Sequence, residues 1–80
     1  MTYIATFFSH FGAIRFNKEL SAKGTAVTLM PVPRALSSSC GTCASFTADE
    51  LPAYSHMDEL EQIAVSNADH SYTVIYSSEE

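Results

Sequence analysis

The sequence predicts an α+β protein: a ferredoxin-like βαββαβ sandwich, in which two helices cover one face of a four-stranded antiparallel sheet. Two observations lead to this prediction. Short segments rich in β-branched and aromatic residues alternate with two segments of helical apolar spacing, in the order strand, helix, strand, strand, helix, strand. The hydrophobic fraction of 46%, with five Phe and four Tyr, is ample for a packed core. We therefore expect a single domain over residues 1–80.

The first strand and the first helix follow from the segment that ends at Gly24. Residues 3–8 are aromatic and β-branched, which suits a strand with at least one buried face. Ser9 can cap the helix that follows, and Gly24 can end it in a left-handed conformation. The apolar side of this helix is formed by Ala13, Phe16 and Leu20.

Two short strands flank a serine-rich connection. Residues 26–30 alternate as a strand, and Pro31 and Pro33 end it because proline has no backbone N–H to donate. Residues 43–46 form a short third strand. The connection over residues 31–42 is therefore the longest loop of the domain, and loops held by a rigid sheet are common places for function.

The second helix is expected over residues 48–67. Residues 47–50 match a capping box, and the helix can break between residues 52 and 55, where Pro52 weakens it. The apolar residues at helical spacing are Leu60, Ile63 and Ala64. Residues 72–76 alternate as the final strand.

Charge and length restrict the classes of partner. The net charge is −5, from nine acidic and four basic residues, and all four bases lie in the first 34 residues. So few bases exclude a nucleic-acid surface and argue against an anionic membrane. A chain of this length buries only about 60–65% of its unfolded surface, which leaves a homodimer open.

The start of the chain has neither a basic segment nor a long apolar segment of a secretory signal. No apolar run approaches the roughly 20 residues of a membrane span. We expect a cytoplasmic protein, in which thiols are kept reduced.

Both cysteines of the chain form one C-x-x-C motif, Cys40 to Cys43. In a reducing compartment such a motif indicates a catalytic, redox-active or metal-binding site rather than a structural disulfide. The nucleophile in thiol chemistry is the thiolate, so an anion at Cys40 would need support. Arg34 supplies a permanent positive charge six residues upstream.

Three further residues beside the thiol are candidates for binding the transferred atom. Ser38 and Ser39 offer hydroxyl donors, and Gly41 allows a partner to approach closely. The alternative is that Cys40 is an inert, half-buried thiol at the entrance of a strand. Cys43 is either a resolving thiol that attacks a persulfide on Cys40, or a residue that fills an inward strand position. If the third strand starts at residue 42, alternation gives the two cysteines different surroundings.

The chain resembles the "putative selenium/sulfur carrier protein-like" family of small α+β domains. The resemblance is strongest over Pro31-x-Pro33-Arg34 and Ser38-Ser39-Cys40-Gly41, and it includes Thr6-Phe7, the helix over 13–20 and Gly24-x-x-Val27. The resemblance implies that Cys40 carries the sulfur or selenium, that Cys43 is a feature of part of the family, and that donor and acceptor proteins are the partners. We expect such a protein to act as a stoichiometric carrier more than as an enzyme, and to need no cofactor.

Two other functions remain open from the residues. A Cys40–Cys43 dithiol could act as a redox switch in an interaction module. A zinc-binding dimer is the third hypothesis, but a zinc site needs about four ligands, and His10, His56 and His70 are isolated from one another. A thioredoxin fold is excluded because no long helix begins at Cys40.

Overall fold

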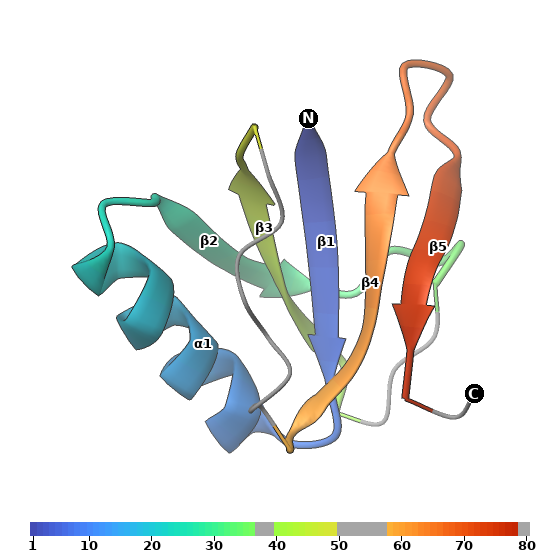
Figure 1. Ribbon diagram of the computed structural model, residues 1–80. Coiled ribbons are helices and arrows are strands. Elements are labelled where there is room, and N and C mark those ends of the chain that lie inside the picture. Colours follow the sequence, from blue (N-terminus) through green and yellow to red (C-terminus); the bar gives the residue numbers. More distant parts are fainter. Residues whose placement is uncertain (37–39, 50–57, 79–80) are drawn as a thin grey trace.

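A five-stranded antiparallel sheet with one helix on one of its faces forms the centre of the computed structural model, which describes residues 1–36, 40–49 and 58–78 (Figure 1). The strand order is β2-β3-β1-β4-β5, and every neighbouring pair is antiparallel. Helix α1 contacts β1, β2 and β3. The elements are β1 (Thr2–Phe7), α1 (His10–Ala22), β2 (Val27–Pro31), β3 (Thr42–Thr47), β4 (Leu60–Ser66) and β5 (Tyr72–Ser77).

The first half of the chain confirms the predicted elements. Ser9 is the N-cap of α1, with an extended φ of −142°, and its hydroxyl accepts a hydrogen bond from the Gly12 N–H. Gly24 follows the helix with a φ of +89°, in the left-handed region that glycine adopts without strain. The side chains predicted to be buried, Ala13, Phe16 and Leu20, are at most 1% exposed.

The predicted βαββαβ fold is wrong in its second half. Residues 60–66, expected to be the end of a second helix, form strand β4 between β1 and β5. The sheet therefore has five strands instead of four, and the described residues contain one helix instead of two. Residues 50–57 of the predicted helix lie outside the described residues.

A β-bulge explains why β4 has the apolar spacing of a helix. Phe7 pairs with Leu60 and Thr6 pairs with Gln62, so β4 contains one extra residue between these pairs. Leu60 and Ile63, three residues apart, consequently face the same side of the sheet. The next residue, Ala64, is buried on the other side, and a strand covered on both faces shows a continuous apolar run instead of alternation.

The turn between β4 and β5 is held by side chains that favour turns. The Asn67 N–H donates to the Ser71 carbonyl at 2.9 Å, and the Ser71 hydroxyl donates to Oδ1 of Asp69 at 2.6 Å. The hydrogen bonds from Ser71 lower the pKa of the Asp69 carboxyl. His70 occupies the left-handed position, with a φ of 69°. The hairpin therefore depends on short-range polar contacts typical of Asn and Asp in turns.

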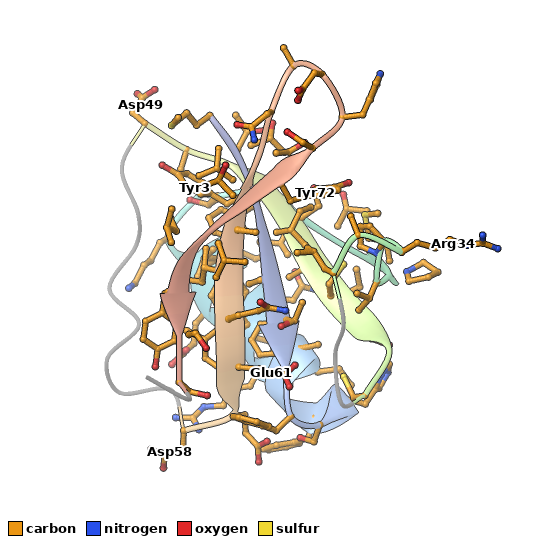
Figure 2. The ribbon with its side chains drawn as sticks, turned by 90° about the vertical axis from the view of Figure 1, so that its right-hand side faces the viewer. Tyr3, Arg34, Asp49, Asp58, Glu61 and Tyr72 are labelled. Carbon is orange, nitrogen blue, oxygen red and sulfur yellow. The ribbon has the colours of Figure 1, made fainter. Side chains whose placement is uncertain are left out.

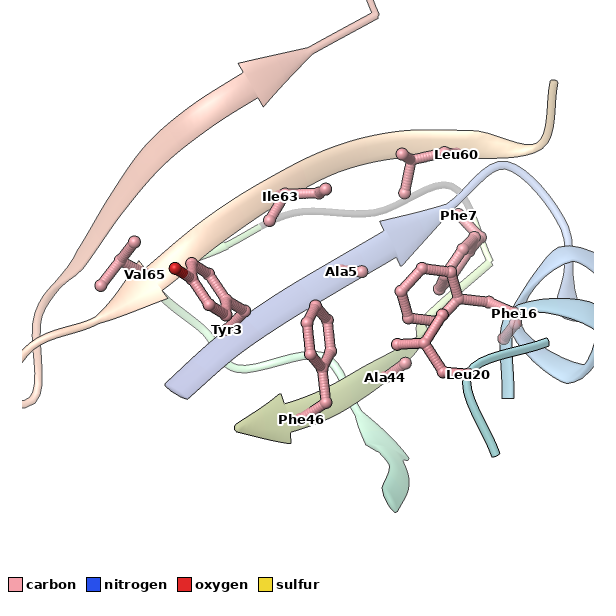
Figure 3. Close-up of a cluster of buried hydrophobic side chains, with 11 residues drawn as sticks. Tyr3, Ala5, Phe7, Phe16, Leu20, Ala44, Phe46, Leu60, Ile63 and Val65 are labelled. Atoms are coloured by element: carbon pink, nitrogen blue, oxygen red, sulfur yellow. The ribbon is translucent and has the colours of Figure 1, made fainter. Parts of the chain in front are cut away.

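Two separate clusters of buried side chains lie on the two faces of the sheet. The helix-side core includes three aromatic pairs with ring centroids 5.2–5.4 Å apart: Tyr3–Phe46, Phe7–Phe16 and Phe16–Phe46 (Figure 3). Its members are Tyr3, Ala5, Phe7, Ala13, Phe16, Leu20, Ala44, Phe46, Leu60, Ile63 and Val65. The opposite core is smaller and consists of Ile4, Leu36, Cys43 and Ala64, with Met30, Val32 and Tyr72 packed against it. In Figure 1 the segment that follows β2, which contributes Val32 and Leu36, passes behind the sheet.

No helix in the described ranges is both long enough and apolar enough to cross a membrane.

Candidate functional site

Cys40 lies just before β3, at the end of the sheet where β1 leads into α1. Its side chain is partly buried and packs against the helix-side core. Its thiol donates a hydrogen bond to the Thr42 carbonyl, with the sulfur 3.4 Å from the oxygen. The thiol is therefore held in place by a neutral acceptor while part of the residue stays accessible to solvent.

The residue after this thiol, Gly41, has a φ of +75°. Among the described residues, nothing lies within 4 Å of a Cβ added at this position. The conformation, rather than crowding, therefore favours glycine. The Gly41 carbonyl accepts a hydrogen bond from the Val32 N–H at 3.1 Å, which attaches the turn to the segment after β2.

Cys43 has the opposite environment. Its side chain is 0% exposed and belongs to the opposite core, where the thiol is 3.7 Å from the Pro31 carbonyl oxygen. Burial, and secondarily a negative charge at Cys40, raise the pKa of the Cys43 thiol. The neutral thiol is thereby favoured, and a neutral buried cysteine behaves as a small apolar residue.

The two cysteines of the motif thus face different sides of the sheet. Strand β3 begins at Thr42, so the pleat directs Cys43 into the opposite core while Cys40 packs on the helix-side core. Both are free thiols in the structure. A Cys40–Cys43 disulfide requires one sulfur to leave its core.

The other predicted site residues fall in two groups. Arg34 lies in the turn after β2, is exposed, and extends away from the body of the molecule (Figure 2). Among the described residues, no hydrogen bond or ion pair joins it to Cys40. Ser38 and Ser39 lie outside the described residues. The role of these three side chains in stabilising an anion stays a prediction.

His10 lies beside the thiol turn, whereas the sequence pattern indicated an isolated histidine. Its Nδ1 lies 3.2 Å from Oγ1 of Thr42, the residue whose carbonyl accepts the Cys40 thiol. The contact arises because β1 pairs antiparallel with β3, with Thr6 opposite Cys43, so that the start of α1 meets the start of β3. The paired residues are separated by about half the length of the chain. The one local signal in the sequence was the Ser9 cap, which indicates that His10 begins the helix.

No group of three or more His, Cys, Asp and Glu side chains within residues 1–36, 40–49 and 58–78 is arranged to hold a metal ion. His10 lies at the start of α1 and His70 lies in the β4–β5 turn, while His56 is outside the described residues.

Comparison with known proteins identifies the family. The family model described as "putative Se/S carrier protein-like" matches residues 2–68. The matched region includes β1 through β4 and both cysteines, and β5 lies beyond it. No curated protein and no solved structure shows a match to the chain. The chain therefore belongs to the putative Se/S carrier protein-like family.

Proposed function

We propose that the protein is a thiol carrier that holds reduced sulfur or selenium on Cys40 and passes it to a partner protein. The observation that carries the proposal is the difference in burial between the two cysteines of the C-x-x-C motif, in a chain that belongs to this family. Cys40 is partly exposed beside an open glycine turn, whereas Cys43 is fully buried and its pKa is raised. We therefore propose that the first thiol, and not the second, meets another protein.

The chemistry consists of two thiol exchanges without net oxidation. In loading, the Cys40 thiolate attacks the outer sulfur of a donor persulfide. A new S–S bond forms, the S–S bond of the donor breaks, and the donor thiolate leaves and takes up a proton. In release, a thiolate of the acceptor attacks the outer sulfur on Cys40, and the Cys40 thiolate leaves. A perselenide donor reacts in the same way with selenium in place of the outer sulfur.

Two features of the described part of the loop support this role. Among the described residues, none lies within 4 Å of a Cβ added at Gly41, which suits the approach of a second protein to this turn. The Val32–Gly41 hydrogen bond attaches the turn to the segment after β2, and the Cys40 thiol donates a hydrogen bond to the Thr42 carbonyl within the turn. We propose that Arg34, Ser38 and Ser39 stabilise the anion once the loaded sulfur or selenium is present. A reducing compartment, which we propose to be the cytoplasm, keeps the thiol free.

The resolving role of Cys43 stays a prediction, and it has a structural cost. To attack a persulfide on Cys40, the Cys43 sulfur must leave the opposite core and lose its contact with the Pro31 carbonyl. In the proposed cycle the acceptor protein supplies the second thiol instead.

Intact mass spectrometry after incubation with inorganic polysulfide tests the proposal. The wild-type protein is expected to gain about 32 Da per sulfur, reversed by dithiothreitol. Cys40→Ser should remain unloaded, and Cys43→Ala, the matched control, should load as the wild type does. A selenium donor, perselenide from a selenocysteine lyase, should give an adduct of about 79 Da in the same pattern.

Release is measured by adding a thiol protein and following the loss of the adduct. If Cys43→Ala loads normally but retains its sulfur, Cys43 is the resolving thiol and the external-acceptor step is wrong. If Cys40→Ser still loads, the carrier role of Cys40 is wrong.

A further inference from the structure

Three exposed apolar side chains gather where β1 leads into α1. Phe8, Phe11 and Ile14 are 41%, 66% and 40% exposed. Phe11 and Ile14 are three residues apart on the helix and therefore lie on one side of it. Of the other large exposed apolar side chains of the described residues, Met1 precedes β1, and Val74 and Ile75 lie on β5. A clustered set of exposed aromatic and aliphatic residues is typical of a surface that contacts another molecule.

This apolar cluster adjoins the reactive thiol. His10, between Phe8 and Phe11 in the chain, contacts the Thr42 side chain, and the Thr42 carbonyl accepts the Cys40 thiol. A protein that covers the start of α1 would therefore also reach the turn that carries Cys40.

Basic residues continue the cluster along the helix. Arg15 and Lys18 are exposed and follow Phe11 and Ile14 by four residues each, so they extend the same side of α1. The acidic residue of α1, Glu19, follows Arg15 by four residues and is half-buried. Glu59 also lies at this end, but its Oε2 accepts a hydrogen bond from the Ser9 hydroxyl at 2.9 Å. In a chain with four bases and a net charge of −5, two bases on one helix side form a distinct local field.

We propose that Phe8, Phe11, Ile14, Arg15 and Lys18 form a docking face for the donor or acceptor protein, whose own surface is an apolar patch bordered by Asp and Glu. This inference rests on the proposed carrier function and specifies the chemistry of the partner. A partner with that charge is attracted to α1. In a symmetric dimer through this face, the bases of the two copies would meet and repel one another. An anionic membrane is repelled by the net charge of −5, which the attraction of two bases does not offset.

The test measures how fast Cys40 exchanges with short peptides that carry an activated disulfide. One peptide surrounds its cysteine with Leu and Asp or Glu, and the other has Lys or Arg in place of the acidic residues. The wild-type protein should react about tenfold faster with the acidic peptide at low ionic strength, and the preference should shrink as salt is added. If the basic peptide reacts as fast or faster, the net charge of the whole chain dominates and the docking face is wrong.

Single substitutions locate the preference. Arg15→Glu and Lys18→Glu should each remove most of it, whereas Lys23→Glu, which makes the same charge change at the C-cap of α1, should retain it. Phe11→Ala should slow the acidic peptide severalfold, and Val74→Ala on β5 should leave the rate unchanged. Equal effects of Lys23→Glu and Arg15→Glu would show a general charge effect and overturn the proposal.

Loading with inorganic polysulfide separates the two proposals, because so small a donor needs no docking face. Normal polysulfide loading without a peptide preference would contradict the docking face alone. Failure of polysulfide to load Cys40 would contradict the carrier function, whatever the peptides show. Light scattering and flotation with anionic vesicles complete the test: a dimer or vesicle binding that Phe11→Ala abolishes would assign the face to a second copy or a membrane and overturn the proposed partner.

Discussion

The two faces of the sheet differ in what covers them and in the cysteine that they hold. The helix-side core is built from large side chains, with Phe16 of α1 in contact with Phe7 and Phe46. The opposite core contains smaller side chains and is covered by Leu36, in the segment that leads towards Cys40. The helix-side core is therefore the main source of stability. Leu36, which covers the opposite core, also anchors the segment that leads towards Cys40.

The largest expected effect of a substitution lies in the helix-side core. Phe16→Ala should lower the free energy of unfolding by about 3–5 kcal/mol, because it removes two aromatic contacts and leaves a cavity. Leu36→Ala should lower the free energy of unfolding by about 2 kcal/mol, because Leu36 packs in the smaller opposite core, where fewer buried side chains surround it. Urea unfolding of both variants measures the difference, with exposed Phe11→Ala as control. A loss at Leu36 as large as that at Phe16 would show that the two faces contribute equally.

Cys43 tests the opposite core directly. Cys43→Ser places a hydroxyl in an apolar cluster and should cost about 1–3 kcal/mol in unfolding free energy. Cys43→Ala should cost about 1 kcal/mol, because it leaves only a small cavity. Both variants should load sulfur on Cys40 normally. If Ser is tolerated better than Ala, the position is more polar than the buried cluster indicates.

Gly12 tests the contact between α1 and the start of β4. An added Cβ would lie 2.5 Å from Cβ of Glu59, so Gly12→Ala forces the helix or the turn before β4 to move. Such overpacking costs about 1–3 kcal/mol, which exceeds the gain of about 1 kcal/mol from replacing a helical glycine. We expect a net loss of about 1 kcal/mol. Ser21→Ala, at an exposed position of the same helix, should change stability by less than about 0.5 kcal/mol in the same unfolding experiment. A Gly12→Ala variant that is more stable than the wild type would show that this contact is not tight.

The smallest expected effect is an alkaline pH dependence from Cys43. Its folded pKa is raised by burial, so at high pH the unfolded chain loses this proton before the folded protein does. The contribution to stability is complete below the ordinary thiol pKa of about 8.5 and is lost as the pH rises from there through the folded value. The difference in unfolding free energy between the wild type and Cys43→Ala should therefore shrink above about pH 8.5. A difference that is constant with pH would contradict the burial of the Cys43 thiol.

The local signals in residues 2–47 were sufficient to predict the first four elements. The Ser9 cap, the helical spacing of Ala13, Phe16 and Leu20, and the left-handed Gly24 act over short distances and appear in the structure as expected. The bulge in β4 is different, because it arises from pairing with β1 more than fifty residues earlier. It gave Leu60 and Ile63 a helical spacing in a strand, and only the turn residues Asn67 and Asp69 indicated a hairpin instead.

For the candidate site, the sequence identified the motif but could not decide the surroundings of its two thiols. The start of β3 at Thr42 decides them, because it directs Cys43 into the opposite core. The contact of His10 with Thr42 depends on the pairing of β1 with β3. No local pattern contains that information.

The central claim is that Cys40 alone carries the transferred atom. The most direct test loads the native wild-type protein with polysulfide, alkylates it at short intervals, and maps the products by peptide mass spectrometry. We predict that the added sulfur of about 32 Da appears first on the peptide that contains Cys40, while Cys43 remains an unmodified thiol until the protein is unfolded. Sulfur first found on Cys43, or a Cys40–Cys43 disulfide as the earliest product, would contradict it.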